Sequence, residues 1–115
     1  MYDRLYAEAS GDSFANARKR ERELLQEIIR KLAMAKQRGP LSAEAFEATS
    51  YMRRLWSAFI ADLSSEENAL PPPLRASLIS IGLWMHGQAD LIDSGRSTNF
   101  DGLIEINQII ADGLI

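Results

Sequence analysis

The sequence contains no cysteine and only one histidine, His86, among its 115 residues. Without cysteine the chain cannot form disulfides, thiolate-ligated zinc sites or a thiol nucleophile, and one imidazole cannot build a multi-histidine metal centre. Gly82 and Gly87 lie inside a helical pattern and are not followed by the Lys-Ser/Thr pair of a phosphate-binding loop. We therefore expect a protein that is not an enzyme and that binds no metal and no cofactor.

Long apolar runs are also missing. A membrane-spanning helix needs about 20 predominantly apolar residues, and no stretch of this chain approaches that length. The first ten residues, MYDRLYAEAS, lack the positively charged and then apolar layout of a secretion signal. The absence of cysteine agrees with a reducing compartment. These features predict a protein that does not insert into membranes and that works in the cytoplasm.

Signals for β-strands are equally scarce, because β-branched residues are few and alternating apolar patterns are absent. Apolar residues instead recur at helical spacing over four stretches. They predict helices over residues 13–38, 42–63, 73–93 and 100–112. The expected fold is all-α, with residues 1–115 forming one small domain that resembles a four-helix bundle.

Capping residues mark the ends of these helices. Gly39 and Pro40 should stop the first helix, and Ser42 is suited to cap the second because its hydroxyl can accept a backbone N–H. Thr98 stands three residues before Asp101, which is the spacing of a capping box for the last helix.

Residues 1–12 carry a further, shorter helical pattern. Its apolar members keep the spacing of one helix face: Tyr2, Leu5, Tyr6 and Ala9. The pattern predicts either a short leading helix, packed on the bundle or awaiting a partner, or a mobile arm.

Charge is divided unevenly between the two parts of the chain. Residues 1–38 carry nine Lys/Arg against six Asp/Glu, and residues 39–115 carry four against ten. The basic part centres on RKRERE, residues 18–23, in which the two signs alternate. Alternating charge is more typical of a solvated helix face than of a nucleic-acid-binding arm. Binding to nucleic acid is therefore not the first expectation.

Residues 51–63, YMRRLWSAFIADL, place two arginines inside an apolar run. On a helical projection the large apolar residues, Trp56 and Phe59 among them, fall within an arc of about 140°. Arg53 lies at the edge of this arc, where its methylenes can border the core while the guanidinium stays wet. Arg54 lies on the reverse face among small side chains. It is expected either to be simply solvated or to meet a carboxylate of a partner.

The predicted helix over residues 73–93 is apolar nearly all the way round. One stripe suits a core, and the far side also carries large apolar residues, namely Leu83, Trp84 and Leu91. Such a helix is either central in its domain or presents a second face to another molecule. Both interpretations stay open. In the second, these three residues would line a groove for an amphipathic helix of another protein.

Asn107 interrupts the apolar face of the last predicted helix. A buried amide without partners costs about 1–3 kcal/mol, so it must be hydrogen-bonded. A structural bond to a loop carbonyl is the first expectation, and a specificity contact is the second.

Two strings, YMRRLWSAFIADLSSEENALPPPLRASLISIGLWM and FDGLIEINQIIADGL, closely resemble the bacterial flagellar biosynthesis regulator FlaF family. The shared elements occur in order: Tyr-x-Arg-x-Leu-Trp, a polar loop ending in Leu-Pro, Ile-Gly-Leu-Trp and Ile-Asn-x-x-Ile-Ala-x-Gly-Leu. They span residues 51–114, and MYDRLYAEA supports the likeness more weakly. Ala69 and the triple proline at 71–73 depart from the family's shorter loop, which affects loop contacts rather than the helices.

The resemblance implies a small cytoplasmic protein that is required for flagellin production and opposes the translational repressor FlbT. It also implies a link to flagellin secretion, as an export chaperone or adaptor. Flagellin would then be the partner, with FlbT as a functional link. The candidate partner-binding residues are Arg53, Arg54, Trp56, Phe59, Leu83, Trp84 and Leu91, although Phe59 is equally suited to the core.

The alternative is a post-transcriptional regulator that touches flagellin messenger RNA directly. The residues that would serve this role are Arg18, Lys19, Arg20 and Arg22. A structural subunit of a larger flagellar assembly is a third possibility, and self-association without flagellin would favour it.

Overall fold

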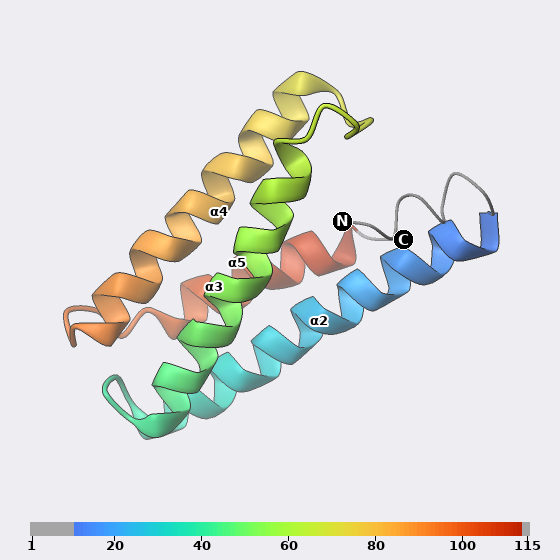
Figure 1. Cartoon of the computed structure of the whole chain (residues 1–115). Helices are drawn as coiled ribbons and strands as arrows, with labels where there is room; N and C mark the ends of the chain where they lie inside the picture. The colour runs from blue at the N-terminus through green and yellow to red at the C-terminus, as the bar shows by residue number, and fades with distance from the viewer. Residues whose placement is uncertain (1–10, 114–115) are drawn as a thin grey trace.

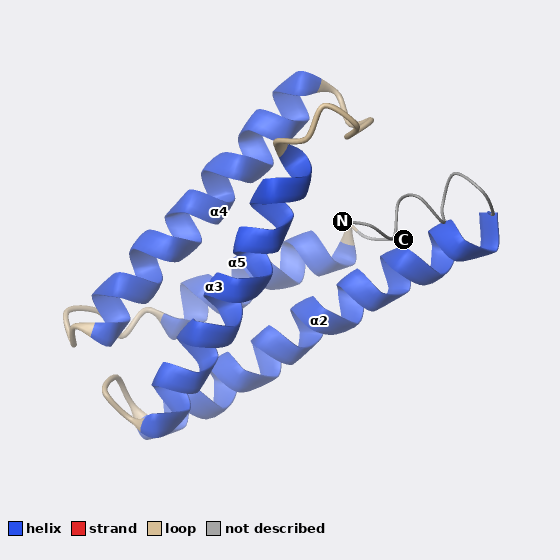
Figure 2. Cartoon of the chain, in the orientation of Figure 1, coloured by secondary structure: helices blue, strands red, loops and turns tan. Residues whose placement is uncertain are grey.

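Four helices make up the computed structural model, which describes the backbone of residues 11–113 and the side chains of residues 15–113 (Figure 2). Their bounds are α2 Gly11–Arg38, α3 Ala43–Leu63, α4 Pro72–Asp93 and α5 Phe100–Asp112. Within the described residues there is no strand, so the all-α expectation is confirmed. The expectation for residues 1–12 falls outside the described range, except that residues 11 and 12 belong to α2.

The helices pack as two pairs, and the main contact between the pairs is that of α2 with α3 (Figure 1). α2 packs against α5, α3 packs against α4, and α2 and α3 join the two pairs. α3 and α4 run side by side in opposite directions, connected by residues 64–71. The apolar character of α4 left open whether this helix is central in the domain. The contacts show that it is not. Its main neighbour is α3, and the side turned away from α3 faces outward.

The core lies where α2, α3 and α5 meet, and α4 closes it from one side. Its largest fully buried side chains are Trp56, Phe100, Leu25, Ile28, Leu32, Met52, Met85, Ile92 and Leu103. These residues recur at helical spacing on each element, so each helix buries one apolar stripe. Burial of these apolar side chains is the main force that holds the four helices together.

A hydrogen-bonded polar pair sits inside this core. The indole N–H of Trp56 donates to Asn107 Oδ1 at 2.9 Å, and the Asn107 amide donates to the Leu103 carbonyl at 2.8 Å. Met52 and Met85 place their sulfur atoms near the same amide nitrogen. The buried amide is thus satisfied, as expected, but its partners are an indole of α3 and its own helix rather than a loop carbonyl.

Local capping explains where the helices begin. The Ser42 hydroxyl accepts the Ala45 N–H at 3.1 Å, as predicted for the start of α3. At α5 the cap is Asn99, whose Oδ1 accepts the Gly102 N–H at 3.1 Å. The Thr98 prediction was therefore wrong by one residue, since α5 begins at Phe100 and its cap must immediately precede it.

Ion pairs and one glycine hold α4 close to α3. Arg53 Nη2 lies 2.8 Å from Asp90 Oδ1 and 2.6 Å from Asp93 Oδ2, and the Thr49 hydroxyl donates to Asp93 Oδ1 at 2.7 Å. Partial burial acts to lower the pKa of Arg53, but the hydrogen bonds to the two aspartates outweigh it and raise that pKa overall. A Cβ on Gly82 would lie 2.8 Å from Ile60 Cδ1, so only glycine permits this approach without a shift.

Candidate protein-binding surface on α4

The side of α4 turned away from α3 carries no charged residue over about four turns. We call it the outer face, and its residues are Ala76, Ser77, Ser80, Leu83, Trp84, Gly87, Gln88 and Leu91. The charged residues of α4, Arg75, Asp90 and Asp93, lie on the side that meets α3 or at its border. The solvent-facing side of a helix normally carries the charge, so this arrangement is inverted.

Two large apolar side chains dominate the outer face. Leu83 is 61% exposed and Trp84 is 38% exposed. Both lie among small or polar uncharged neighbours, and Leu91, half-buried, continues the surface toward the end of the helix. Exposed aromatic and aliphatic groups in a charge-poor patch are typical of the central part of a protein–protein interface.

Gly87 adds space at the same surface. A Cβ built on Gly87 would meet no atom within 4 Å, whereas one on Gly82 would meet α3. Packing within the described part of the chain therefore does not require a glycine at position 87. Glycine in a helix interior costs about 1 kcal/mol relative to alanine, and here it leaves the backbone open to close approach from outside.

From residue 50 onward, the exposed surface of α3 is made of small residues and one cation, namely Ser50, Arg54, Ser57, Ala58 and Ala61. Nearer its start, α3 also exposes Phe46 and Glu47. The Arg54 guanidinium lies over the Tyr51 ring, with its Cζ atom 5.7 Å from the ring centroid. Arg54 therefore stands on the surface, whereas the guanidinium of Arg53 is paired with α4 instead of being simply solvated.

The structure separates the candidate residues into two groups. Trp56 is 1% exposed and Phe59 is 9% exposed, and their rings pack edge to face with centroids 5.3 Å apart. Both are turned into the core. Phe59 thus takes the core position that was left open for it, whereas Trp56 does not lie at the partner surface where it was expected. Leu83, Trp84 and Leu91 share the outer face, with Arg54 on the adjacent helix.

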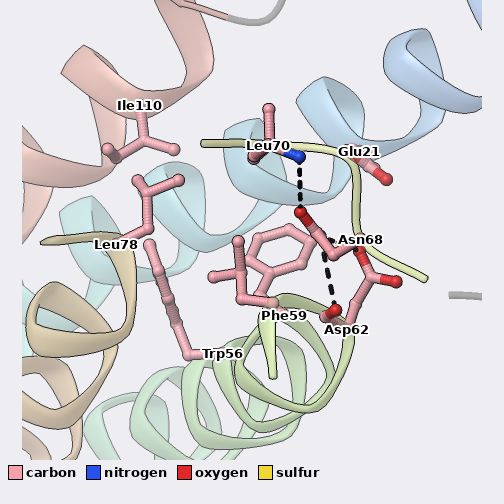
Figure 3. Close-up of a pocket in the computed structure, with 9 residues that line it drawn as sticks. Glu21, Trp56, Phe59, Asp62, Asn68, Leu70, Leu78 and Ile110 are labelled. Atoms are coloured by element: carbon pink, nitrogen blue, oxygen red, sulfur yellow. Dashed lines mark hydrogen bonds between the residues drawn. The ribbon is translucent and has the colours of Figure 1, made fainter. Parts of the chain in front are cut away.

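Sequence reasoning missed an apolar crevice at the end of the molecule that carries residues 64–71 (Figure 3). Its lining combines all four helices and this loop, through Glu21, Trp56, Phe59, Asp62, Leu63, Asn68, Leu70, Leu78 and Ile110. The space measures about 130 Å³. No local pattern predicts it, because it forms where side chains of four separate helices and one loop converge.

The basic cluster of α2 does not form a flat patch. Lys19 and Arg20 are exposed, whereas Arg18 and Arg22 are half-buried. Successive residues of a helix point about 100° apart, so the four cations are spread round α2 with Glu21 among them. A groove-reading or phosphate-binding surface would need them on one side.

Two further features of residues 11–113 bear on function. No three His, Asp or Glu side chains of this range are grouped so that they could hold a metal ion. None of the four described helices combines the length and the apolar character required to cross a membrane.

Comparison with known proteins gives one result that covers almost the entire chain. The family model described as flagellar protein FlaF matches residues 2–114. No curated protein and no solved structure was found to match the sequence.

Proposed function

This chain belongs to the FlaF family of flagellar proteins, and we propose that it binds flagellin in the cytoplasm and promotes its synthesis and secretion during flagellum assembly. In this role it is an export chaperone and regulator, and it needs no catalysis. The observation that carries the proposal is the outer face of α4, which leaves Leu83 and Trp84 exposed on a surface without charge.

The physical basis is the behaviour of amphipathic helices in water. Such a helix, like those expected at the ends of flagellin, exposes an apolar stripe that drives self-association when nothing covers it. The outer face of α4 can cover that stripe by helix-on-helix packing, which is one of the recurring modes of peptide recognition. The bound flagellin would stay monomeric until export removes it.

The size and chemistry of the surface suit a specific and reversible complex. A standard interface buries about 800 Å² on each partner, and a few aromatic anchors supply most of its binding energy. Trp84 is the expected anchor because it offers large area at low entropic cost, with Leu83 and Leu91 beside it. Arg54 on α3 would pair with a carboxylate at the rim of the complex.

The first experiment is to mix the purified chain with purified flagellin and to measure co-elution and affinity. Trp84→Ala should weaken binding by at least about 2 kcal/mol, which is roughly thirtyfold in Kd, while the helical content stays unchanged. Ile109→Ala is the matched control, because Ile109 is 57% exposed on α5 and lies outside the outer face. Equal loss with both variants, or no co-elution of the parent protein, would refute the proposal.

The alternative role on flagellin messenger RNA is tested in the same preparation. Direct binding would weaken steeply as salt rises and would disappear when the cluster of Arg18, Lys19, Arg20 and Arg22 is neutralised. The dispersal of these cations round α2 favours the protein-binding proposal. A link to FlbT would then follow from competition for flagellin, and adding purified FlbT to the flagellin complex tests this.

A further inference from the structure

The outer face of α4 has the same pattern in both directions from Gly87. Leu83 and Leu91 stand four residues before and four residues after this glycine. Ser80 and Ser94, the C-cap of the helix, stand seven residues before and seven after it. On a helical projection all four lie within about 40° of the direction of Gly87. A strip with this symmetry can pack against its own copy turned by half a turn, so that each leucine opposes a leucine and each serine opposes a serine.

The absence of charge on this face permits such a contact. In a two-fold contact a residue near the axis faces its own copy, so any charge there would meet a charge of the same sign. The outer face carries no charged residue. Asp90 and Asp93, the aspartates of α4, are paired with Arg53 of α3. The face can therefore meet a second copy of itself without like-charge repulsion.

Gly87 provides space at the centre of the strip. A Cβ at this position would meet no atom within 4 Å, so a second helix can approach the backbone here. Close approach brings Leu83 of one copy, which is 61% exposed, onto Leu91 of the other. Trp84 borders the strip on the side away from α3 and would cover its edge.

The size of the strip sets the strength of the contact. From Ser80 to Ser94 it is about 21 Å long, and a helix is about 10 Å wide, which gives about 200 Å² of projected area. A standard interface buries about 800 Å² on each partner, and smaller ones belong to weak, transient complexes. We therefore expect pairing that is weak and reversible, and that a partner with a larger surface displaces.

We propose that, in the absence of flagellin, two copies of this chain pair through the outer face of α4 in a dimer whose two-fold axis passes beside Gly87. Pairing covers Leu83, Trp84 and Leu91 until a flagellin helix takes the place of the second copy. The dimer is inferred from the geometry of α4 alone, whereas its exchange for flagellin rests on the proposed function.

Sedimentation equilibrium of the full chain without flagellin is the first test. The average mass should be that of one chain at about 1 μM and should approach that of two chains near 1 mM. It should not rise further, because a two-fold contact uses the same patch on both copies and is closed. A structural subunit of a larger assembly would continue to add copies.

Charge at the axis gives the sharper test. Gly87→Glu and Gly87→Lys each place like charges face to face, and each should raise the Kd of the dimer at least about tenfold. Ile109→Glu adds the same charge at an exposed apolar position of α5 and should leave this Kd unchanged. Far-UV circular dichroism checks the fold of all variants. Leu83→Gln adds no charge and should weaken the dimer by about the same factor as the Gly87 variants.

Mixing the two Gly87 variants tests the two-fold symmetry itself. Glutamate and lysine then face each other across the axis, so an equimolar mixture should form a dimer with one chain of each kind. A contact between two different patches would not bring position 87 of one copy against position 87 of the other, and mixing would then restore nothing.

Flagellin separates this proposal from the proposed function. Adding flagellin to the dimer should give a complex that contains one copy of this chain. A dimer that is rescued by mixing the Gly87 variants, but that does not respond to flagellin, would refute flagellin binding and leave the dimer standing. Flagellin binding by a chain that stays monomeric would do the reverse.

Four outcomes would overturn the dimer. They are a mass that stays at one chain up to about 1 mM, species larger than two chains, equal effects of Gly87→Glu and Ile109→Glu, and no rescue when the Gly87 variants are mixed. A complex that holds two copies of this chain on one flagellin would overturn the exchange, because the two partners would then use different surfaces.

Discussion

The two tryptophans occupy opposite sides of the α3–α4 pair and have opposite environments. Trp56 on α3 is 1% exposed, packs edge to face with Phe59 and donates a hydrogen bond to Asn107. Trp84 on α4 is 38% exposed and lies on a surface without charge. The difference teaches that the helix next to each indole, rather than the sequence around it, decides whether the ring is buried in the core or left at the surface.

The largest test of this comparison is truncation of each indole. Trp56→Ala should lower the free energy of unfolding by about 4 kcal/mol, because it opens a cavity and leaves the buried Asn107 carbonyl without its donor. Trp84→Ala should lower it by less than about 1 kcal/mol. Urea unfolding followed by circular dichroism measures both.

If Trp56→Ala does not fold, Trp56→Phe keeps an aromatic ring and removes the N–H. Its expected cost is about 1–3 kcal/mol, from the unpaired Asn107 oxygen. Similar losses at positions 56 and 84 would mean that the two indoles play the same structural role, and the comparison would fail.

Helical periodicity predicts the four helices, but it does not predict which of the two tryptophans is buried and which is exposed. Apolar spacing and the caps at Gly39 and Ser42 are local, and the structure follows them closely. Whether α4 is central depends on which helix pairs with which, and contacts between residues far apart in the sequence decide that. The same limit explains why Trp56 was expected at a partner surface and why the crevice was not foreseen.

Two glycines of α4 provide a second test, because one faces α3 and the other faces outward. A Cβ at position 82 would lie 2.8 Å from Ile60 Cδ1 and 3.1 Å from Trp56 Cε3, whereas one at position 87 meets nothing. Gly87→Ala should stabilise the chain by about 0.5–1 kcal/mol through helix propensity.

Gly82→Ala gains the same propensity but must displace Ile60 and press on the Trp56 ring. Overpacking of this kind costs about 1–3 kcal/mol, so this variant should be less stable than Gly87→Ala by about that amount. Thermal and urea midpoints of both variants give the answer. Equal stabilisation by the two substitutions would show that α3 and α4 do not pack closely at Gly82.

The adjacent arginines of α3 extend the comparison to charge. Arg53 pairs with Asp90 and Asp93 of α4 and is 31% exposed, whereas Arg54 lies on the surface over the Tyr51 ring. Arg53→Met should cost about 1–2 kcal/mol, between the values of exposed and buried ion pairs. Arg54→Met should cost about 0.5 kcal/mol but should weaken flagellin binding. If Arg54→Met cost more stability than Arg53→Met in urea unfolding, Arg54 rather than Arg53 would be the arginine that stabilises the fold.

The smallest expected effect concerns the ion pair that joins α2 to α3 away from both indoles. Lys31 Nζ lies 2.6 Å from Glu47 Oε1, and this hydrogen bond holds the pKa of Glu47 below its ordinary value of 4.5. A carboxyl whose pKa is lowered by folding stabilises the folded state above its unfolded pKa, and that contribution is lost as the pH falls through the folded value. Glu47→Gln should therefore be slightly less stable than the parent chain at pH 7, and the difference should vanish as the pH drops below 4.5.

A double-mutant cycle with Lys31→Met isolates the pair, because the coupling between the two substitutions should be present at pH 7 and absent in acid. A coupling that persists unchanged in acid would mean that the two side chains interact by packing rather than by charge.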